Sequence, residues 1–264
     1  MSNLSERIIR RIQGLADELK KKNGIINEII RDDVLQILQA CDCTVLYFPL
    51  DDGDGGCDGC HLVKPVNGRM EQFVFVNTNN TRERQAFTAA HELGHVWKVD
   101  ERLKEEFPDE EINDEVAINR FAAELLMPEN FFVRVLNEYL KKISYAGPKI
   151  KLNDLVKVIA YLMNYFFVPY KSVVLRLNEV KRLDERYNEK VLDYKDSNLL
   201  KDIIMTEQYT RLGIKNKIKS MDNLQEYLLE AEEKKVINAT KANNIRNTFD
   251  ILKLEENPEE DVTF

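Results

Sequence analysis

The stretch of sequence that decides the fold is Phe87-Thr88-Ala89-Ala90-His91-Glu92-Leu93-Gly94-His95. The chain has three histidines, and two of them stand here, four residues apart. On a helix, residues at this spacing share one face, so both imidazoles would point at the same ion. Zinc accepts imidazole nitrogens in tetrahedral geometry and, in catalytic sites, keeps one position for water. The stretch therefore predicts a zinc site on a helix.

Glu92 directly follows the first of these two histidines. A carboxylate in this place takes the proton from a metal-bound water while that water attacks a carbonyl. We therefore expect Glu92 to be the catalytic base of a hydrolytic site. The alternative is that His91 and His95 lie on a solvated helix face and bind no metal.

The expected third ligand is Glu115, which lies twenty residues after His95. This spacing is similar to that of zincins whose third ligand is a glutamate. Asn119, one helical turn further on, would accept the N–H of a ligand histidine and so fix its tautomer and direction. Glu115 also lies in an acidic run, so a solvated carboxylate is the alternative. If the register differs, the ligand would be Asp114 or Glu111.

The rest of the sequence predicts helices around a small antiparallel sheet, which places the chain in the α+β class. Helical spacing of apolar residues predicts helices over 4–22, 26–41, 81–99, 112–127, 129–142, 152–164 and 170–182. Strand-like runs lie at 44–50, 61–66 and 72–77. Asn67-Gly68 predicts the turn of a hairpin between the last two runs.

Composition places the chain among ordinary globular proteins, with 44% apolar and 32% charged residues among 264. The formal net charge of −8 argues against non-specific binding to nucleic acid or to an anionic membrane. The most apolar stretch, Val158–Val168, is too short to span a bilayer and contains Asn164. The N-terminus lacks the apolar core of a signal peptide. We therefore expect a soluble cytoplasmic protein.

Two blocks carry a more specific signal, Arg84–His95 and Asn119-Arg120-Phe121-Ala122-Ala123-Glu124-Leu125-Leu126-Met127-Pro128. Together they resemble the ImmA/IrrE family of metallopeptidases. The resemblance covers about residues 25–182, and the part at 152–180 is similar to the family's helix-turn-helix-like segment. One departure is Ile118, because the family pattern has alanine directly before the asparagine.

The resemblance implies a minimal zincin-like fold with a three-stranded sheet beside the active-site helix. It implies one zinc ion on His91, His95 and Glu115, with Glu92 catalytic. Known members cleave or inactivate helix-turn-helix repressors that silence mobile elements or stress genes. The expected function is therefore a zinc-dependent endopeptidase acting on such a repressor. The alternatives are a non-catalytic regulator that binds a repressor or toxin, and a DNA-binding regulator that uses the segment 152–180.

We expect three parts along the chain. Residues 1–24 would form an N-terminal helical extension, and residues 25–182 the metallopeptidase domain. Residues 183–264 would form a charged, mainly helical C-terminal region with an acidic end. The sequence leaves open the oligomeric state and what restrains the enzyme.

Four cysteines stand in two close pairs, Cys41 with Cys43 and Cys57 with Cys60. Four thiolates would suit a second, structural zinc ion, and the adjacent His61 would be able to join it. The favoured interpretation is unligated thiols, because a reducing cytosol keeps cysteines as thiols and the first pair is closer than the usual CxxC. A redox pair is the third interpretation.

Two groups that contact the substrate are also expected. The strand containing Phe73, Val74, Phe75 and Val76 leads into the active-site helix, and we expect it to be a sheet edge to which an extended peptide adds. The alternative is that this strand is central in the sheet. A donor to the reacting carbonyl oxygen is needed as well, with candidates His61, Tyr145, Tyr161, Tyr165 or an arginine.

Overall fold

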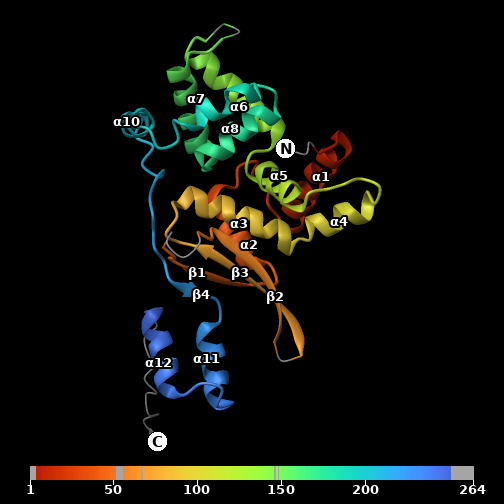
Figure 1. The fold of residues 1–264 in the computed structure, drawn as a ribbon, viewed down its shortest axis with the longest axis vertical. Helices are drawn as coiled ribbons and strands as arrows, with labels where there is room; N and C mark the ends of the chain where they lie inside the picture. Colours follow the sequence, from red (N-terminus) through yellow and green to blue (C-terminus); the bar gives the residue numbers. More distant parts are fainter. Residues whose placement is uncertain (1–3, 52–55, 67, 146, 148, 251–264) are drawn as a thin grey trace, which may run out of the picture.

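The computed structural model describes residues 4–51, 56–66, 68–145, 147 and 149–250. Figure 1 shows a sheet in the middle of the molecule, a helical group (residues 129–206) at one end and a helical hairpin (residues 224–248) at the other. The sheet has the order β2-β3-β1-β4. Its strands are β1 (Thr44–Phe48), β2 (Gly59–Val66), β3 (Arg69–Asn77) and β4 (Ser220–Met221).

Some of the described helices cover one side of this sheet, and others extend the fold at both ends. The first five are α1 (Glu6–Lys22), α2 (Val34–Ala40), α3 (Arg82–Val96), α4 (Val99–Glu106) and α5 (Asp114–Leu126). The later ones are α6 (Glu129–Lys142), α7 (Leu152–Phe166), α8 (Tyr170–Glu179), α9 (Asn188–Leu192), α10 (Asn198–Thr206), α11 (Leu224–Glu233) and α12 (Ala239–Thr248). Short 3-10 turns lie at Arg31–Asp33 and Glu185–Tyr187. The expected α+β class is confirmed.

The expected three-stranded antiparallel sheet is wrong in two respects. A fourth strand, β4, pairs with β1, and β1 runs parallel to β3. β4 has only two residues, too few for a period-two pattern to show in the sequence. The β2–β3 hairpin is antiparallel as expected. Of its predicted turn, Asn67 lies outside the described residues, and Gly68 has a positive φ of 77° that suits glycine.

α3 lies against the sheet face that carries Val45, Val74 and Val76, all fully buried. α5 packs across α3, and Gly94 lies at the contact. A Cβ atom at Gly94 would come 3.1 Å from Phe121 and 3.2 Å from Ile118, both fully buried. Glycine therefore lets the two helices approach closely.

α1 belongs to the same hydrophobic core as these helices. Its residues Ile12, Leu15 and Leu19 are fully buried, and the helix packs against α5. Ser5 caps α1 by accepting a hydrogen bond from the Ile8 amide, and three lysines in the last turn suit the negative end of the helix dipole. The division of the chain at residue 24 stays a prediction.

Residues 211–222 form a strap that runs from the helical group past the start of α3 to the sheet. The Arg82 amide at the first turn of α3 donates to the carbonyl of Ile214 at 2.8 Å. The Gly213 amide donates to the buried Glu83 carboxylate at 3.2 Å. The first bond satisfies a free amide at the start of α3, which has no side-chain cap of its own, and the second ties the strap to the same turn.

α11 and α12 form a helical hairpin beyond β4 with a small hydrophobic cluster of its own, built on Leu224, Leu228 and Ala242. Asp222 ties its base to the sheet by accepting the Val45 amide at 3.0 Å. α10, in contrast, packs on α7 and buries Leu200 and Ile203 in the main core.

Within the described residues, no single helix is long and apolar enough to cross a membrane. α7 and α8 meet the length and composition criteria only as a pair, and they bend by 104° at the break between them.

Replacing Gly94 by valine should destabilise the protein by about 1–3 kcal/mol, because the added atoms would push α3 away from α5. The matched control is Gly14→Val on α1, where the nearest atom to an added Cβ is the mobile Arg11 side chain at 3.6 Å. The control should change stability by less than about 0.5 kcal/mol. Chemical denaturation measures both, and equal effects at the two glycines would contradict the packing argument.

Two truncations should separate the strap from the helical hairpin. A chain ending at Asp222 loses the hairpin and the residues after it but keeps the strap and β4, and it should unfold within a few degrees of the full chain. A chain ending at Thr206 also loses the strap and β4, and it should unfold at a clearly lower temperature because the start of α3 loses its partners. Thermal unfolding followed by circular dichroism tests this, and equal melting temperatures for the two truncations would contradict a stabilising strap.

Candidate metal centre

The structure brings His91 and His95 of α3 together with Glu115 of α5. One potential ligand atom from each lies within 4.8 Å of those of the other two. Nε2 of His91 is 3.5 Å from Oε2 of Glu115, and Nε2 of His95 is 3.7 Å from Oε1. Asp114, the alternative if the register differed, is instead paired with Lys104 at 2.6 Å.

This donor set fits a tetrahedral zinc ion. Two atoms bound to such an ion at about 2.1 Å lie about 3.4 Å apart, close to both measured separations. The side chains of the two histidines are 18% and 22% exposed, so they are partly shielded, whereas that of Glu115 is 67% exposed. The cluster is therefore reachable from solvent on the Glu115 side.

Asn119 holds His91 in the orientation that a metal ligand needs. Its amide nitrogen donates to the Glu115 carbonyl at 2.7 Å, so its oxygen faces His91 Nδ1 at 3.1 Å. Nδ1 is then the protonated nitrogen of the neutral ring, and the Nε2 lone pair points toward Glu115. Asn113 fixes the same turn of α5 by capping the Val116 amide at 3.0 Å.

Glu92 lies beside the cluster and is only 4% exposed. Burial, followed by the charge of Glu115, raises the pKa of Glu92 to about 7. The start of β2 passes directly over it at Gly59. A Cβ atom at Gly59 would lie 2.9 Å from Glu92 Oε1 and 2.4 Å from Thr88 Cγ2, so no larger residue fits there. The sequence does not indicate this contact, because a single glycine beside a Gly-rich loop carries no distinctive pattern.

His61 is the candidate donor that the structure places next to the cluster. Its ring stacks on that of His95 with 6.2 Å between centroids. Its Nε2 lies 3.0 Å from Gln72 Oε1, while the Gln72 amide nitrogen donates to the Asp42 carbonyl. His61 Nε2 is thus the donor to Gln72, and Nδ1 carries the lone pair in the neutral ring, so the neutral ring has no N–H left to donate to a substrate carbonyl oxygen. Desolvation, with the nearby His95, lowers the pKa of His61.

Two of the tyrosine candidates, Tyr161 and Tyr165, lie in an aromatic cluster of the helical group, and Tyr145 follows the end of α6, where its amide donates to the Leu140 carbonyl. Tyr161 stacks on Tyr139 with 3.9 Å between ring centroids, and Tyr165 contacts Phe166 and Phe131. This aromatic cluster joins α6 to α7 and belongs to the packing of the helical group.

The structure does not bring the four cysteines together. Cys41 and Cys43 pack against the core before β1, whereas Cys60 lies on β2, and β3 separates the two strands. Cys57 is exposed and hydrogen-bonds to the Gly59 carbonyl. Among the described residues, the only cluster suited to a metal is His91, His95 and Glu115. A four-cysteine zinc site is therefore not formed here.

The expectation that Phe73, Val74, Phe75 and Val76 form a sheet edge is wrong. These residues belong to β3, which pairs with β2 on one side and with β1 on the other. The free edge next to the active-site helix is β2, because no described strand pairs with its outer side. Pro65 in the sequence indicates that β2 is an edge strand, since proline within a sheet is confined to edge strands and bulges.

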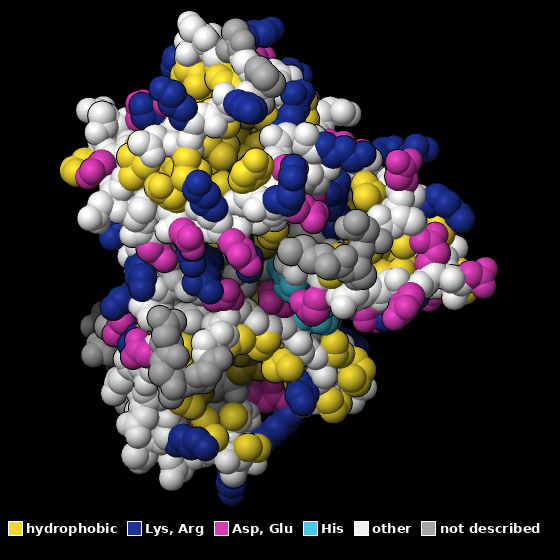
Figure 2. Space-filling model, turned by 45° about the horizontal axis from the view of Figure 1, so that its top comes forward, with side chains coloured by type: hydrophobic (Ala, Val, Ile, Leu, Met, Phe, Trp, Pro, Cys, Tyr) yellow, Lys and Arg dark blue, Asp and Glu magenta, His cyan; other side chains and the backbone are white. Residues whose placement is uncertain are grey.

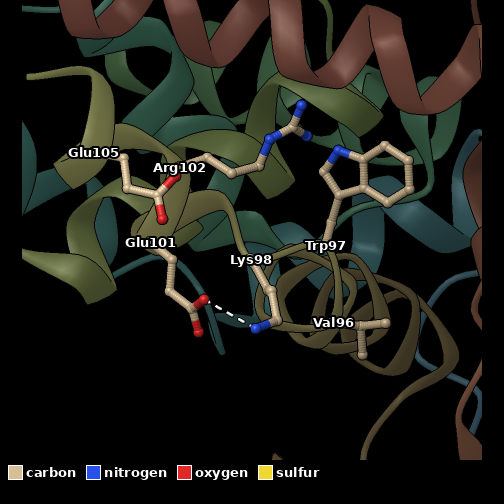
Figure 3. Close-up of a pocket in the computed structure, with 6 residues that line it drawn as sticks. All are labelled: Val96, Trp97, Lys98, Glu101, Arg102 and Glu105. Carbon is tan, nitrogen blue, oxygen red and sulfur yellow. Dashed lines mark hydrogen bonds and ion pairs between the residues drawn. The ribbon is translucent and has the colours of Figure 1, made fainter.

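An open depression lies just past the end of α3, as Figure 3 shows, and it is lined by Val96, Trp97, Lys98, Glu101, Arg102 and Glu105. Lys98 and Glu101 pair across it at 2.9 Å. Lys22 and Arg102 lie over the ring of Trp97 at 4.7 and 5.6 Å from its centroid. None of the clustered ligands lines this depression, so it is separate from the metal centre.

Removal of a ligand should abolish tight metal binding. His95→Ala and Glu115→Ala each leave two protein ligands, too few for a stable zinc site. The matched controls are Glu111→Ala and Asp114→Ala, which remove neighbouring carboxylates outside the cluster and should keep about one zinc per chain. Metal analysis after dialysis measures the content. If the controls lost zinc and Glu115→Ala kept it, Glu115 would not be the third ligand.

Comparison with known proteins adds the family. A family model described as the IrrE N-terminal-like domain, of a peptidase family, matches residues 39–178. No curated protein matches the chain. The matched residues include the whole cluster, Glu92, Asn119 and both sequence blocks that resemble the ImmA/IrrE metallopeptidases. The chain belongs to this IrrE N-terminal-like peptidase family, which implies a metallopeptidase-like function and a bound metal.

Proposed function

We propose that the protein is a zinc-dependent endopeptidase that cleaves an extended segment of another protein. The observation that carries the proposal is the meeting of two imidazoles and one carboxylate within 4.8 Å, with Glu92 buried beside them. When bound there, zinc would polarise the substrate carbonyl and activate a water molecule. Zinc, and not another metal, is proposed because the donors are two nitrogens and one carboxylate oxygen.

The chain's own residues supply the remaining chemistry. Glu92 accepts the proton of the attacking water and passes it to the leaving amine. Asn119 keeps the Nε2 lone pair of His91 directed at the ligand position. Gly59 lets the backbone of β2 pass close to Glu92, which places an edge strand beside the reacting groups.

The substrate is proposed to add to the free edge of β2. The Asn77 amide donates to the Asp58 carbonyl at 2.8 Å, so the backbone groups of Asp58 and of every second residue after it face β3. Those of Gly59, His61 and Val63 therefore point to the open side. The backbone of Pro65 points to the open side as well, so its missing N–H removes no bond to β3. The Gly59 carbonyl accepts the Cys57 thiol, and the other outward groups have no strand partner among the described residues, so an extended peptide can pair with them and lie across the cluster.

The substrate class is proposed from the family resemblance. Its known members act on helix-turn-helix repressors of mobile elements or stress genes, and we propose such a repressor as the target. A flexible linker between the domains of a repressor would supply the extended segment that the β2 edge requires. The reaction would take place in the cytoplasm, where such repressors act.

The two alternative functions fit the structure less well. A regulator that only binds its partner does not need a buried carboxylate beside three metal ligands. A DNA-binding regulator needs an exposed recognition helix that enters the major groove. α8 would have to be that helix, but most of it is buried, and Arg176 is completely so. Arg176 is held by Glu124 and by the Met127 carbonyl.

The decisive variant is Glu92→Gln. Glutamine keeps the shape of the side chain but cannot accept the proton, so the variant should keep its zinc and lose peptidase activity by at least about a hundredfold. Metal analysis and cleavage of a helix-turn-helix repressor or of an unfolded protein provide the two measurements. Full cleavage by Glu92→Gln would show that Glu92 is not the catalytic base. Zinc binding without any cleavage by the wild-type protein would favour the non-catalytic regulator.

A further inference from the structure

The β2–β3 hairpin carries an exposed apolar surface next to the proposed active site. Figure 1 shows the hairpin extending past the rest of the sheet. On this part, Val63 is 46% exposed and Met70 is 65% exposed, and Pro65 is exposed as well. We call these three residues the hairpin platform. Val63 and Pro65 lie on the edge strand β2, where exposed apolar residues promote unwanted pairing and are usually avoided in natural proteins. We therefore expect a bound partner to cover the platform.

The platform lies on the same face of the sheet as the metal cluster. Successive side chains on a strand alternate between its two faces. Gly59 faces Glu92 and His61 stacks on His95, so Val63 and Pro65 continue the same face. Met70 is the cross-strand partner of Pro65 and lies on that face too. Figure 2 shows hydrophobic side chains on the surface beside the histidines.

The direction of β2 decides which part of a substrate meets the platform. β2 starts at the cluster and runs toward the hairpin tip, and Val63 lies about 13 Å along it from Gly59. Antiparallel pairing is slightly more stable per residue than parallel pairing. An antiparallel substrate strand would run from the hairpin tip to the cluster. Its residues over the platform would therefore precede the scissile bond.

We propose that the hairpin platform of Val63, Pro65 and Met70 selects substrates with apolar side chains on the N-terminal side of the scissile bond. A substrate residue opposite Val63 on β2 has its side chain on the same face as Val63, so the two are in contact. Substrate side chains at alternate positions would meet the platform, and those between would face the other side of the sheet. This selectivity rests on the proposed function, because it requires a peptide on the β2 edge.

The test uses the full-length Glu92→Gln protein loaded with zinc, so that bound peptides stay intact. A displayed library of random-sequence peptides is selected on this protein, and the enriched sequences should carry apolar residues at alternate positions. The affinity of one enriched peptide is then measured by fluorescence anisotropy. Val63→Asp and Met70→Asp, each added to Glu92→Gln, should weaken binding by about tenfold through the loss of apolar contact.

The matched control is Leu62→Asp, which introduces the same charge one residue away on the opposite face. Leu62 is 48% exposed, nearly the same as Val63, so the two substitutions differ mainly in the face they change. The control should bind the peptide within about twofold of the parent. Equal weakening by Leu62→Asp, or unchanged binding by both platform variants, would overturn the proposal. So would a selection that enriches no apolar pattern.

Cleavage by the protein with Glu92 intact separates this proposal from the proposed function. Mass spectrometry of the enriched peptide should place the apolar positions before the cut bond, and a cut before them would overturn the proposed direction. Binding that depends on Val63 and Met70 but leads to no cleavage would support the platform as a peptide-binding surface. The same result would refute the peptidase activity.

Discussion

The close contact between α3 and α5 is the constraint on which the metal centre depends. His91 and His95 come from α3, and Glu115 comes from α5, so the donor atoms meet only if the two helices lie close together. Gly94 makes this possible, because any side chain there would press on Ile118 and Phe121. The glycine weakens the helix by about 1 kcal/mol relative to alanine, and the packing it permits offsets that cost.

A buried ionic network holds the far end of α5. Glu124 accepts hydrogen bonds from the Glu129 amide at the start of α6 and from Arg176 on α8. Arg176 also donates to the Met127 carbonyl at 3.0 Å. A buried charge is tolerable only where its partners satisfy it, and here they join three helices at one point. The Ala-Ala-Glu-Leu-Leu-Met-Pro block therefore keeps α5 in place for Glu115, although none of its side chains belongs to the metal cluster.

The sequence predicted the local parts of this site well. Helical spacing is enough to place His91 and His95 on one face, and the acid after His91 follows from the chemistry of the motif. The spacing to Glu115 and Asn119 also led to side chains that the structure places together. Sheet order could not be derived in the same way. Strand patterns indicate which face is buried but not which strands are neighbours, so β3 was expected at the edge when it is central.

Contacts between segments that are far apart in the sequence could not be predicted from it for the same reason. β4 and the strap contribute single hydrogen bonds from a charged region whose composition suggested only helices. Yet they complete the arrangement, because β4 occupies the sheet edge at β1 and leaves β2 as the edge next to α3. The start of α3 is held by Ile214 and Gly213, and the part that carries Thr88 and Glu92 lies under Gly59. One end of this helix is thus fixed by the chain itself, while the other faces the unpaired strand where a substrate has room to bind.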